Sequence, residues 1–141
     1  VQFGKEFTDH MFLADFREGE WRNLRIVPYG KVLMSPATPA LHYGQSIFEG
    51  MKGFAGPENE ILLFRPLSNL QRLNISAERM CMPMLPEDVF MEALTTLVNL
   101  DRKWVPKVPG GSLYIRPFMF SADEYIGIRP SQDFTFMIIN C

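Results

Sequence analysis

Two stretches near the middle of the chain carry apolar residues at helical spacing. The first has a single stripe of positions three or four residues apart, formed by Pro66, Leu70, Leu73, Ala77 and Met80. The second opens at Pro86 and has Glu87 and Asp88 in its first turn, where acidic groups favour the helix dipole. Its apolar face consists of Val89, Phe90, Ala93, Leu94, Leu97 and Val98. The pattern therefore predicts two consecutive helices.

Apolar runs on both sides of the helices predict strands. The runs lie at 7–16, 46–54, 61–64, 112–120 and 134–139. Residues 56–59, Gly-Pro-Glu-Asn, form a turn signal between the second and third runs. The last run has no polar alternation, so we expect that strand to be fully buried. Strands, two helices and then strands predict an α+β domain with a mainly antiparallel sheet.

Composition fits one globular domain and narrows the classes of partner. The 141 residues are 47% hydrophobic and 21% charged, with a net charge of −2, so we expect a single domain over residues 1–141 and no nucleic-acid partner. No apolar run approaches the roughly 20 residues of a membrane helix, and charges at 5, 6 and 9 disfavour a secretory signal.

Both ends look cut: the first residue is valine, and the last apolar run has no polar tail. We expect a longer parent protein.

Cysteines and histidines give no sign of a metal centre. Cys81 and Cys141 are too isolated for a zinc site or a disulfide framework, which favours a reducing, cytoplasmic compartment. His10 and His42 lack any spacing typical of metal ligands. We expect no metal.

Three groups of residues could carry chemistry, and each also has a purely structural interpretation. The first helix has a polar row beside its apolar stripe, made of Arg65, Ser68, Asn69, Arg72, Ser76 and Arg79. Its arginines could bind phosphate, although a solvated face would look the same.

Tyr114 and Arg116 share one face of a strand and could bind a carboxylate, or could be ordinary surface residues. Pro117 should place that strand end at an edge or cleft. The glycines and aromatics of Tyr43-Gly44 and Phe48-Glu49-Gly50 could form a binding turn or a tight core turn.

Taken together, these segments resemble the branched-chain amino acid aminotransferases, pyridoxal-phosphate enzymes of fold type IV. The matching segments are FTDHM from residue 7, LHYGQSIFEGMKGF from 41, LFRPLSNLQRLNISAERM from 63 and SLYIRPFMF from 112. Their order and spacing hold over nearly the whole chain. The resemblance implies the small N-terminal domain of such an enzyme.

The resemblance also implies residue roles. Arg72 would bind the cofactor phosphate. Phe48 and Tyr114 would line the pocket for a branched side chain, Gly50 would leave room beside the substrate, and Arg116 would orient its neighbours. Tyr43 and Ile126 would reach the pocket of a second subunit, which implies a homodimer. The resemblance assigns no clear role to Glu49.

The family's reaction moves an amino group between leucine, isoleucine or valine and 2-oxoglutarate. It needs a lysine that forms a Schiff base with pyridoxal 5′-phosphate, and in the family that lysine lies in a second domain. None of the chain's lysines has that context (Lys5, Lys31, Lys52, Lys103 and Lys107), so we expect this chain alone to be inactive. Two alternatives stay open: a D-amino acid aminotransferase or aminodeoxychorismate lyase of the same fold, and a non-enzymatic assembly domain.

Overall fold

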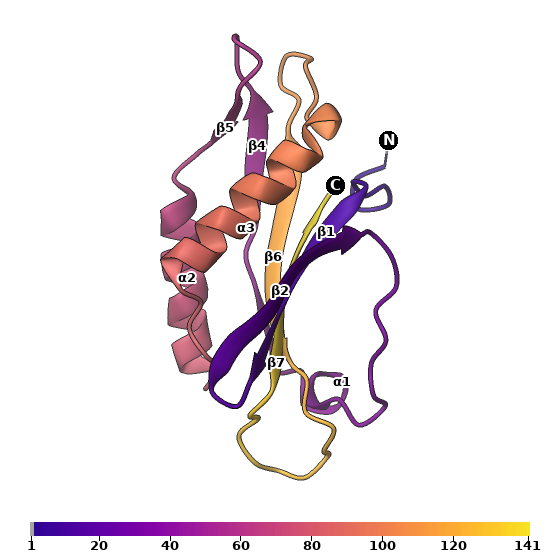
Figure 1. Cartoon of the computed structure of the whole chain (residues 1–141), viewed down its shortest axis with the longest axis vertical. Coiled ribbons are helices and arrows are strands. Elements are labelled where there is room, and N and C mark those ends of the chain that lie inside the picture. The colour runs from indigo at the N-terminus through magenta and orange to yellow at the C-terminus, as the bar shows by residue number, and fades with distance from the viewer. Residues whose placement is uncertain (1) are drawn as a thin grey trace.

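An antiparallel sheet of seven strands forms the middle of the molecule, and two long helices lie against one of its faces (Figure 1). The computed structural model describes residues 2–141. The strands are β1 (His10–Arg17), β2 (Glu20–Pro28), β3 (Ser46–Phe48), β4 (Met51–Ala55), β5 (Ile61–Leu63), β6 (Leu113–Ser121) and β7 (Phe134–Asn140). The helices are α1 (Pro39–Tyr43), α2 (Pro66–Arg79) and α3 (Glu87–Leu100), followed by a 3₁₀ turn at Arg102–Trp104. The predicted α+β class is confirmed.

The sheet mixes strands from before and after the helices. Its order is β2-β1-β7-β6-β4-β5, with β3 pairing β6 beside β4. All the pairings are antiparallel. The last two strands of the chain, β6 and β7, therefore occupy the centre and join the two groups of earlier strands.

The helices bury most of the predicted apolar positions, but Pro66 at the start of α2 is only half-buried. In α2, Leu70, Leu73 and Ala77 are buried, and in α3 five of the six predicted positions are buried while Val89 is half-buried. Met80 was expected on the buried stripe but is 39% exposed. The reason is that α2 ends at Arg79 and Cys81 has a positive φ of 55°, which turns the chain away from the helix axis.

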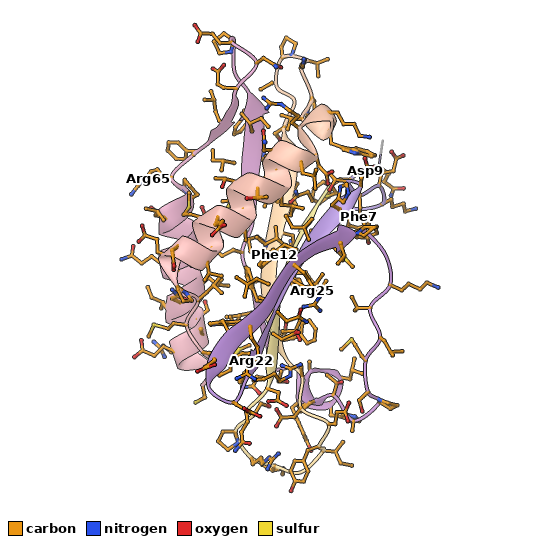
Figure 2. All side chains as sticks on the ribbon, viewed as in Figure 1. Phe7, Asp9, Phe12, Arg22, Arg25 and Arg65 are labelled. Atoms are coloured by element: carbon orange, nitrogen blue, oxygen red, sulfur yellow. The ribbon has the colours of Figure 1, made fainter. Side chains whose placement is uncertain are left out.

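Alternation along β6 separates the two faces of the sheet. Leu113, Ile115 and Met119 are fully buried in the core beneath the helices. Phe12 of β1 belongs to the same layer, between sheet and helices (Figure 2). Tyr114 and Arg116 lie on the opposite face, which we call the open face.

Two elements were missed by the sequence pattern, and one was displaced. β2 has five exposed and polar-rich positions because it is the outer strand of the sheet, and α1 has only five residues. The first strand begins at His10, not at residue 7, since the Phe7 ring stacks on Tyr29 at 4.6 Å outside the sheet. A register shift between Leu13 and Asp15 also breaks the alternation that would have revealed the β1–β2 pair.

The predicted strand over residues 46–54 is continuous in register but interrupted in hydrogen bonding. Phe48 pairs with Phe118 and Met51 with Ile115, so no residue is inserted between β3 and β4. The N–H of Glu49 donates to the carbonyl of Pro117 at 2.8 Å. In an antiparallel ladder Pro117 would return a hydrogen bond, but it has no N–H. Pro117 was expected to place this part of the strand at an edge or cleft, but it does not lie at an edge, because β6 has neighbouring strands on both sides there and continues to Ser121.

Candidate functional site

The segment from Phe48 to Lys52 lies at an exposed edge of the sheet. β3 pairs with β6 alone, and the pairing of β4 with β5 begins only at Gly53. The outer side of residues 48–52 therefore has no neighbouring strand. Side chains on both faces of the sheet can approach this edge, which makes it a natural place for a binding site.

On the helix side of this edge, Glu49 holds the guanidinium of Arg72. Glu49 follows Ile47 and precedes Met51 on the core-facing positions, and it is only 3% exposed. Arg72 donates from Nε to Oε1 at 2.5 Å and from Nη2 to Oε2 at 2.8 Å. Asn69, one turn earlier on α2, donates to Oε2 at 3.0 Å, and the N–H of Gly50 donates to the same atom at 3.3 Å. The buried carboxylate is thus fully surrounded by donors.

These contacts set the ionisation of the pair. Burial alone would raise the pKa of Glu49, but the hydrogen bonds from Arg72 and Asn69 and the positive charge of Arg72 outweigh it and lower the pKa below its usual value. The hydrogen bond to Glu49 in turn raises the pKa of Arg72. Both groups are therefore charged at neutral pH. The Arg72 side chain is nevertheless 70% exposed, so its outer side meets solvent.

On the open face, three of the predicted site residues form one cluster. Arg116 donates from Nη2 to the Tyr114 hydroxyl at 2.8 Å. The Arg116 guanidinium also lies over the Phe48 ring, 4.4 Å from its centroid. Phe48 is 63% exposed, so most of its surface is available for contact. The sequence prediction that Tyr114 and Arg116 share a face is confirmed by this contact.

Gly50 lies against the same cluster, because the register of the flanking pairs, Phe48 with Phe118 and Met51 with Ile115, places it opposite Arg116. A Cβ added at Gly50 would stand 2.3 Å from the Tyr114 hydroxyl oxygen. The Gly50 carbonyl also accepts from Asn69 Nδ2 at 3.3 Å. Gly50 therefore touches both groups of residues, one through the phenol and one through the amide.

A hollow of about 670 Å³ opens at this edge between the two groups. Its polar lining includes Asn69 and Tyr114, and its apolar walls are Phe54, Leu62 and Phe64. Asn69 comes from the helix side and Tyr114 from the open face, so the hollow joins the two. An apolar concavity with a few converging polar groups is typical of a small-molecule site.

Tyr43 and Ile126 form a separate pair. Tyr43 is the last residue of α1, and its hydroxyl donates to the Ile126 carbonyl in the loop between β6 and β7. Both side chains are more than half exposed. The structure therefore brings these two predicted residues together, and none of the contacts described above joins them to the Phe48 cluster.

The remaining arginines of the predicted row on α2 do not join the site. Arg65 precedes the helix in a left-handed conformation and projects into solvent (Figure 2). Arg79 ends the helix and is exposed. Within residues 2–141, Asn69 and Arg72 are the members of the row that hydrogen-bond to Glu49. The solvated interpretation thus holds for part of the row and not for its centre.

Lysines and potential metal ligands contribute little to the site. Lys52 lines the hollow and pairs in register with Tyr114, whereas Lys103 is engaged by Asp9 at 2.6 Å. No group of three or more histidine, cysteine or acidic side chains suited to a metal occurs in residues 2–141. Over the same residues, no helix has the length and apolar character needed to cross a bilayer.

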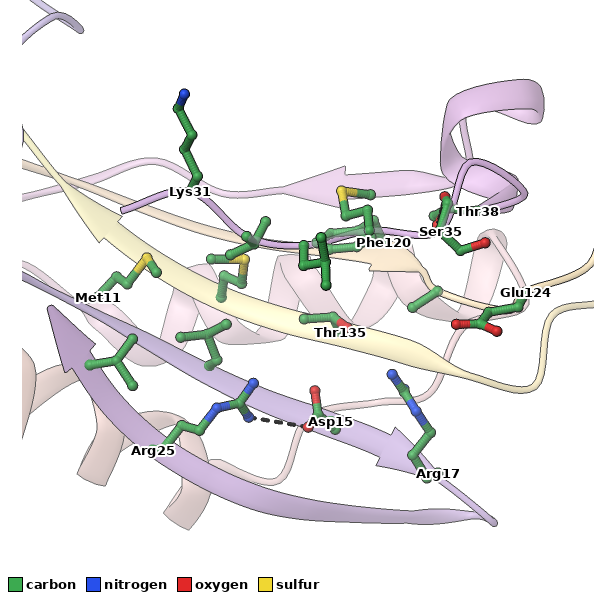
Figure 3. A pocket seen from close by; sticks show the side chains of 17 residues that line it. Met11, Asp15, Arg17, Arg25, Lys31, Ser35, Thr38, Phe120, Glu124 and Thr135 are labelled. Carbon is green, nitrogen blue, oxygen red and sulfur yellow. Dashed lines mark hydrogen bonds and ion pairs between the residues drawn. The ribbon is translucent and has the colours of Figure 1, made fainter. Parts of the chain in front are cut away.

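A second cavity, of about 440 Å³, lies on the open face beneath the segment from Lys31 to Thr38 (Figure 3). Arg25 and Asp15 pair across its wall at 3.1 Å. Its other walls include Met11 and Met137 of the sheet. None of the predicted site residues lines this cavity, so we treat the sheet edge as the candidate site.

Sequence reasoning left Glu49 without a role, although a signal was present. A charged residue between Ile47 and Met51 occupies a core-facing position of an alternating strand. Such a charge requires a buried partner. The positive partner could have been sought among the arginines of the following helix.

Comparison with known proteins gives a consistent set of relatives, although no protein-family model matches the sequence. Branched-chain-amino-acid transaminase 1 of Bacillus subtilis is 48% identical over 97% of this chain and 39% of its own length. The branched-chain-amino-acid aminotransferase of Mycolicibacterium smegmatis is 44% identical over 97% of this chain and 38% of its own length. The chain therefore spans well under half the length of the curated relatives it matches.

Solved structures give the same picture. The branched-chain amino acid aminotransferase of Escherichia coli superimposes with a TM-score of 0.71 at 25% identity, covering 95% of this chain and 40% of that one. The branched-chain aminotransferase of the thermophilic archaeon Thermoproteus uzoniensis, solved with norvaline, superimposes with a TM-score of 0.71 at 21% identity, covering 95% and 40%. The second likeness supports the fold alone.

Proposed function

We propose that this chain, whose sequence and fold match the N-terminal domain of the branched-chain aminotransferases, supplies the phosphate anchor and part of the substrate pocket of a pyridoxal-phosphate transaminase. The complete protein would transfer the amino group of leucine, isoleucine or valine to 2-oxoglutarate, giving a branched-chain 2-oxo acid and glutamate. The observation that carries the proposal is the exposed guanidinium of Arg72, held by Glu49 at the sheet edge. Gly50 and Asn69, which also hydrogen-bond to Glu49, line the apolar hollow.

Arg72 fits the phosphate of the cofactor. Its Nε and one hydrogen of Nη2 are used by Glu49, and no hydrogen bond within residues 2–141 reaches Nη1. A guanidinium can bind a second anion through its remaining edge, because it has five donors in one plane. Bound there, pyridoxal phosphate would supply the aldehyde carbon that carries the amino group between substrates and the ring that accepts electrons.

The open-face cluster fits an aliphatic amino acid. Phe48 and Tyr114 offer aromatic surface to a branched side chain, and Gly50 keeps the space beside the phenol free of a Cβ. Arg116 is held by both aromatic rings and directs the Tyr114 hydroxyl by hydrogen bonding. In this proposal the cluster binds and orients the substrate, while its apolar surface excludes water.

We propose further that the complete protein is a homodimer. The hydrogen-bonded pair of Tyr43 and Ile126 supports this, since both residues are exposed and stand apart from the Phe48 cluster of their own chain. Each pair would then close the pocket of the other subunit. Two unpaired cysteines, Cys81 and Cys141, support the cytoplasmic location that we expect for the enzyme.

The complete protein tests the proposal through Arg72. Arg72→Lys keeps the positive charge but loses the planar fork, so we expect its affinity for pyridoxal phosphate to fall about 10- to 100-fold, the range for a charge-assisted hydrogen bond or two. The dissociation constant is measured from the cofactor's absorbance, and leucine transamination with 2-oxoglutarate is assayed in parallel. Arg79→Lys on the same helix is the matched control, because Arg79 is exposed and outside the site.

Substrate choice separates the rival enzymes. A complete protein that prefers D-alanine to L-leucine would indicate a D-amino acid aminotransferase and contradict the proposal. A protein that binds pyridoxal phosphate with no transamination of either would favour the lyase. Failure to bind the cofactor at all would favour an assembly domain.

A further inference from the structure

We propose that Glu49 is a positioning residue that presents the guanidinium of Arg72 to the phosphate group of the cofactor. The inference deepens the proposed function and rests on it, because it assumes that Arg72 is the phosphate ligand. It assigns a role to the one buried carboxylate at the sheet edge, which the resemblance left without one.

The contacts of Glu49 fix both its backbone and its two carboxylate oxygens. Its backbone is held by the Pro117 carbonyl at 2.8 Å. Its Oε2 accepts from Asn69 at 3.0 Å and from the Gly50 N–H at 3.3 Å, so the carboxylate does not depend on Arg72 for its orientation. Arg72 then attaches through two hydrogen bonds, one to each oxygen. The buried carboxylate of Glu49 is thus fixed by its other contacts, and it holds the exposed guanidinium of Arg72 in place.

The geometry leaves the useful side of Arg72 available. A guanidinium has a side edge, formed by Nε and one Nη, and a distal edge formed by the two Nη atoms. Glu49 occupies the side edge. The Arg72 side chain is 70% exposed, and no hydrogen bond within residues 2–141 reaches Nη1, so the distal edge is available to a ligand. A phosphate approaching from outside would meet donors that are already oriented.

Two opposing effects of Glu49 on phosphate affinity must be compared. Its negative charge repels an anion, and salt screens that repulsion only in part because Glu49 is buried, although the hydrogen-bonded Arg72 offsets its charge. An unrestrained exposed arginine has much rotamer freedom to lose, which weakens binding by roughly tenfold or more. We therefore expect orientation to outweigh repulsion.

The test measures how much the phosphate group adds to binding. The dissociation constants of pyridoxal 5′-phosphate and of pyridoxal, which lacks the phosphate, are measured for the complete protein and for Glu49→Gln. We define the ratio as the dissociation constant of pyridoxal divided by that of pyridoxal 5′-phosphate, so that a larger ratio means a larger contribution from the phosphate. We expect this ratio to fall about tenfold in Glu49→Gln, equivalent to about 1.4 kcal/mol. A purely structural role for Glu49 would weaken both ligands equally and leave the ratio unchanged.

Three further variants make the result decisive. Asp101→Asn removes another buried carboxylate, which binds His10 and lies outside the site, and should leave the ratio unchanged even if stability falls. Glu49→Asp keeps the charge, so its ratio should lie between those of Glu49→Gln and the unchanged protein. It also keeps the test possible if Glu49→Gln folds poorly. The double variant of Glu49→Gln and Arg72→Lys should bind pyridoxal 5′-phosphate no more weakly than Arg72→Lys alone.

The outcomes separate this inference from the proposed function. An unchanged or increased ratio in Glu49→Gln, with a reduced ratio in Arg72→Lys, would overturn the positioning role alone. An unchanged ratio in Arg72→Lys would instead overturn Arg72 as the phosphate ligand. A reduced ratio in both variants supports the two proposals together.

Discussion

The space beside Gly50 is filled by the side chain of Tyr114. In Gly50→Ala the new Cβ would fall 2.3 Å from the phenol oxygen, so Tyr114 must move and give up its hydrogen bond from Arg116. We expect destabilisation of about 1–3 kcal/mol, the usual cost of overpacking. Urea unfolding of this chain measures it. Gly30→Ala is the matched control, because nothing lies within 4 Å of a Cβ at that exposed position. Equal midpoints for the two variants would contradict the assigned contact.

For single residues, the sequence predicted the face of the sheet on which a side chain lies better than the residue that it contacts. Period-two alternation correctly predicted that Tyr114 and Arg116 share a face. It could not predict the pairing of Glu49 with Arg72, because they are 23 positions apart and two strands, the turn between them and the start of a helix intervene. Which arginine of the α2 row meets the carboxylate depends on how α2 docks against the edge. Docking is set by packing of distant residues, which local patterns do not record.

The connection between α2 and α3 depends on one asparagine. Asn74 donates from Nδ2 to the Leu85 carbonyl at 3.0 Å and accepts from the Leu85 N–H at 2.8 Å. Leu85 is only 1% exposed, so Asn74→Ala would leave a buried donor and acceptor without partners. We expect a loss of about 1–3 kcal/mol in unfolding free energy. Asn99→Ala on α3 is the control, since its bond to Arg102 is exposed and should matter by less than about 0.5 kcal/mol. Similar losses in both variants would contradict this role.

The predicted elements were those with strong periodicity. α2, α3, β6 and β7 bury enough apolar surface for the pattern to identify them. β2 escaped prediction because an outer strand needs no regular apolar face, and α1 because five residues are too few to show a period. The boundary between β3 and β4 was also hidden, since it arises from the missing N–H of Pro117 on a different strand. Elements defined by their neighbours need the tertiary structure.

Considered as a whole, the molecule contains the residues that we propose as a phosphate anchor and a substrate wall. Within residues 2–141, no lysine is fixed beside Arg72. Lys103 is paired with Asp9, and Lys52 lies on the open face, opposite in direction to Glu49 and its partner Arg72. No single lysine of this chain would therefore react selectively with a cofactor bound at Arg72. We therefore expect this chain alone to be unable to transaminate.

Chemical trapping tests that expectation on the chain as it stands. After incubation with pyridoxal phosphate and reduction with borohydride, mass spectrometry should find label spread thinly over exposed lysines, with none approaching one label per chain. Lys52→Arg should leave that distribution otherwise unchanged. Lys52 is the critical position because it lines the hollow that also contains Asn69 and Tyr114. A stoichiometric adduct on Lys52, abolished in Lys52→Arg, would mean that this chain carries its own covalent cofactor chemistry and that the lysine need not come from elsewhere in the protein.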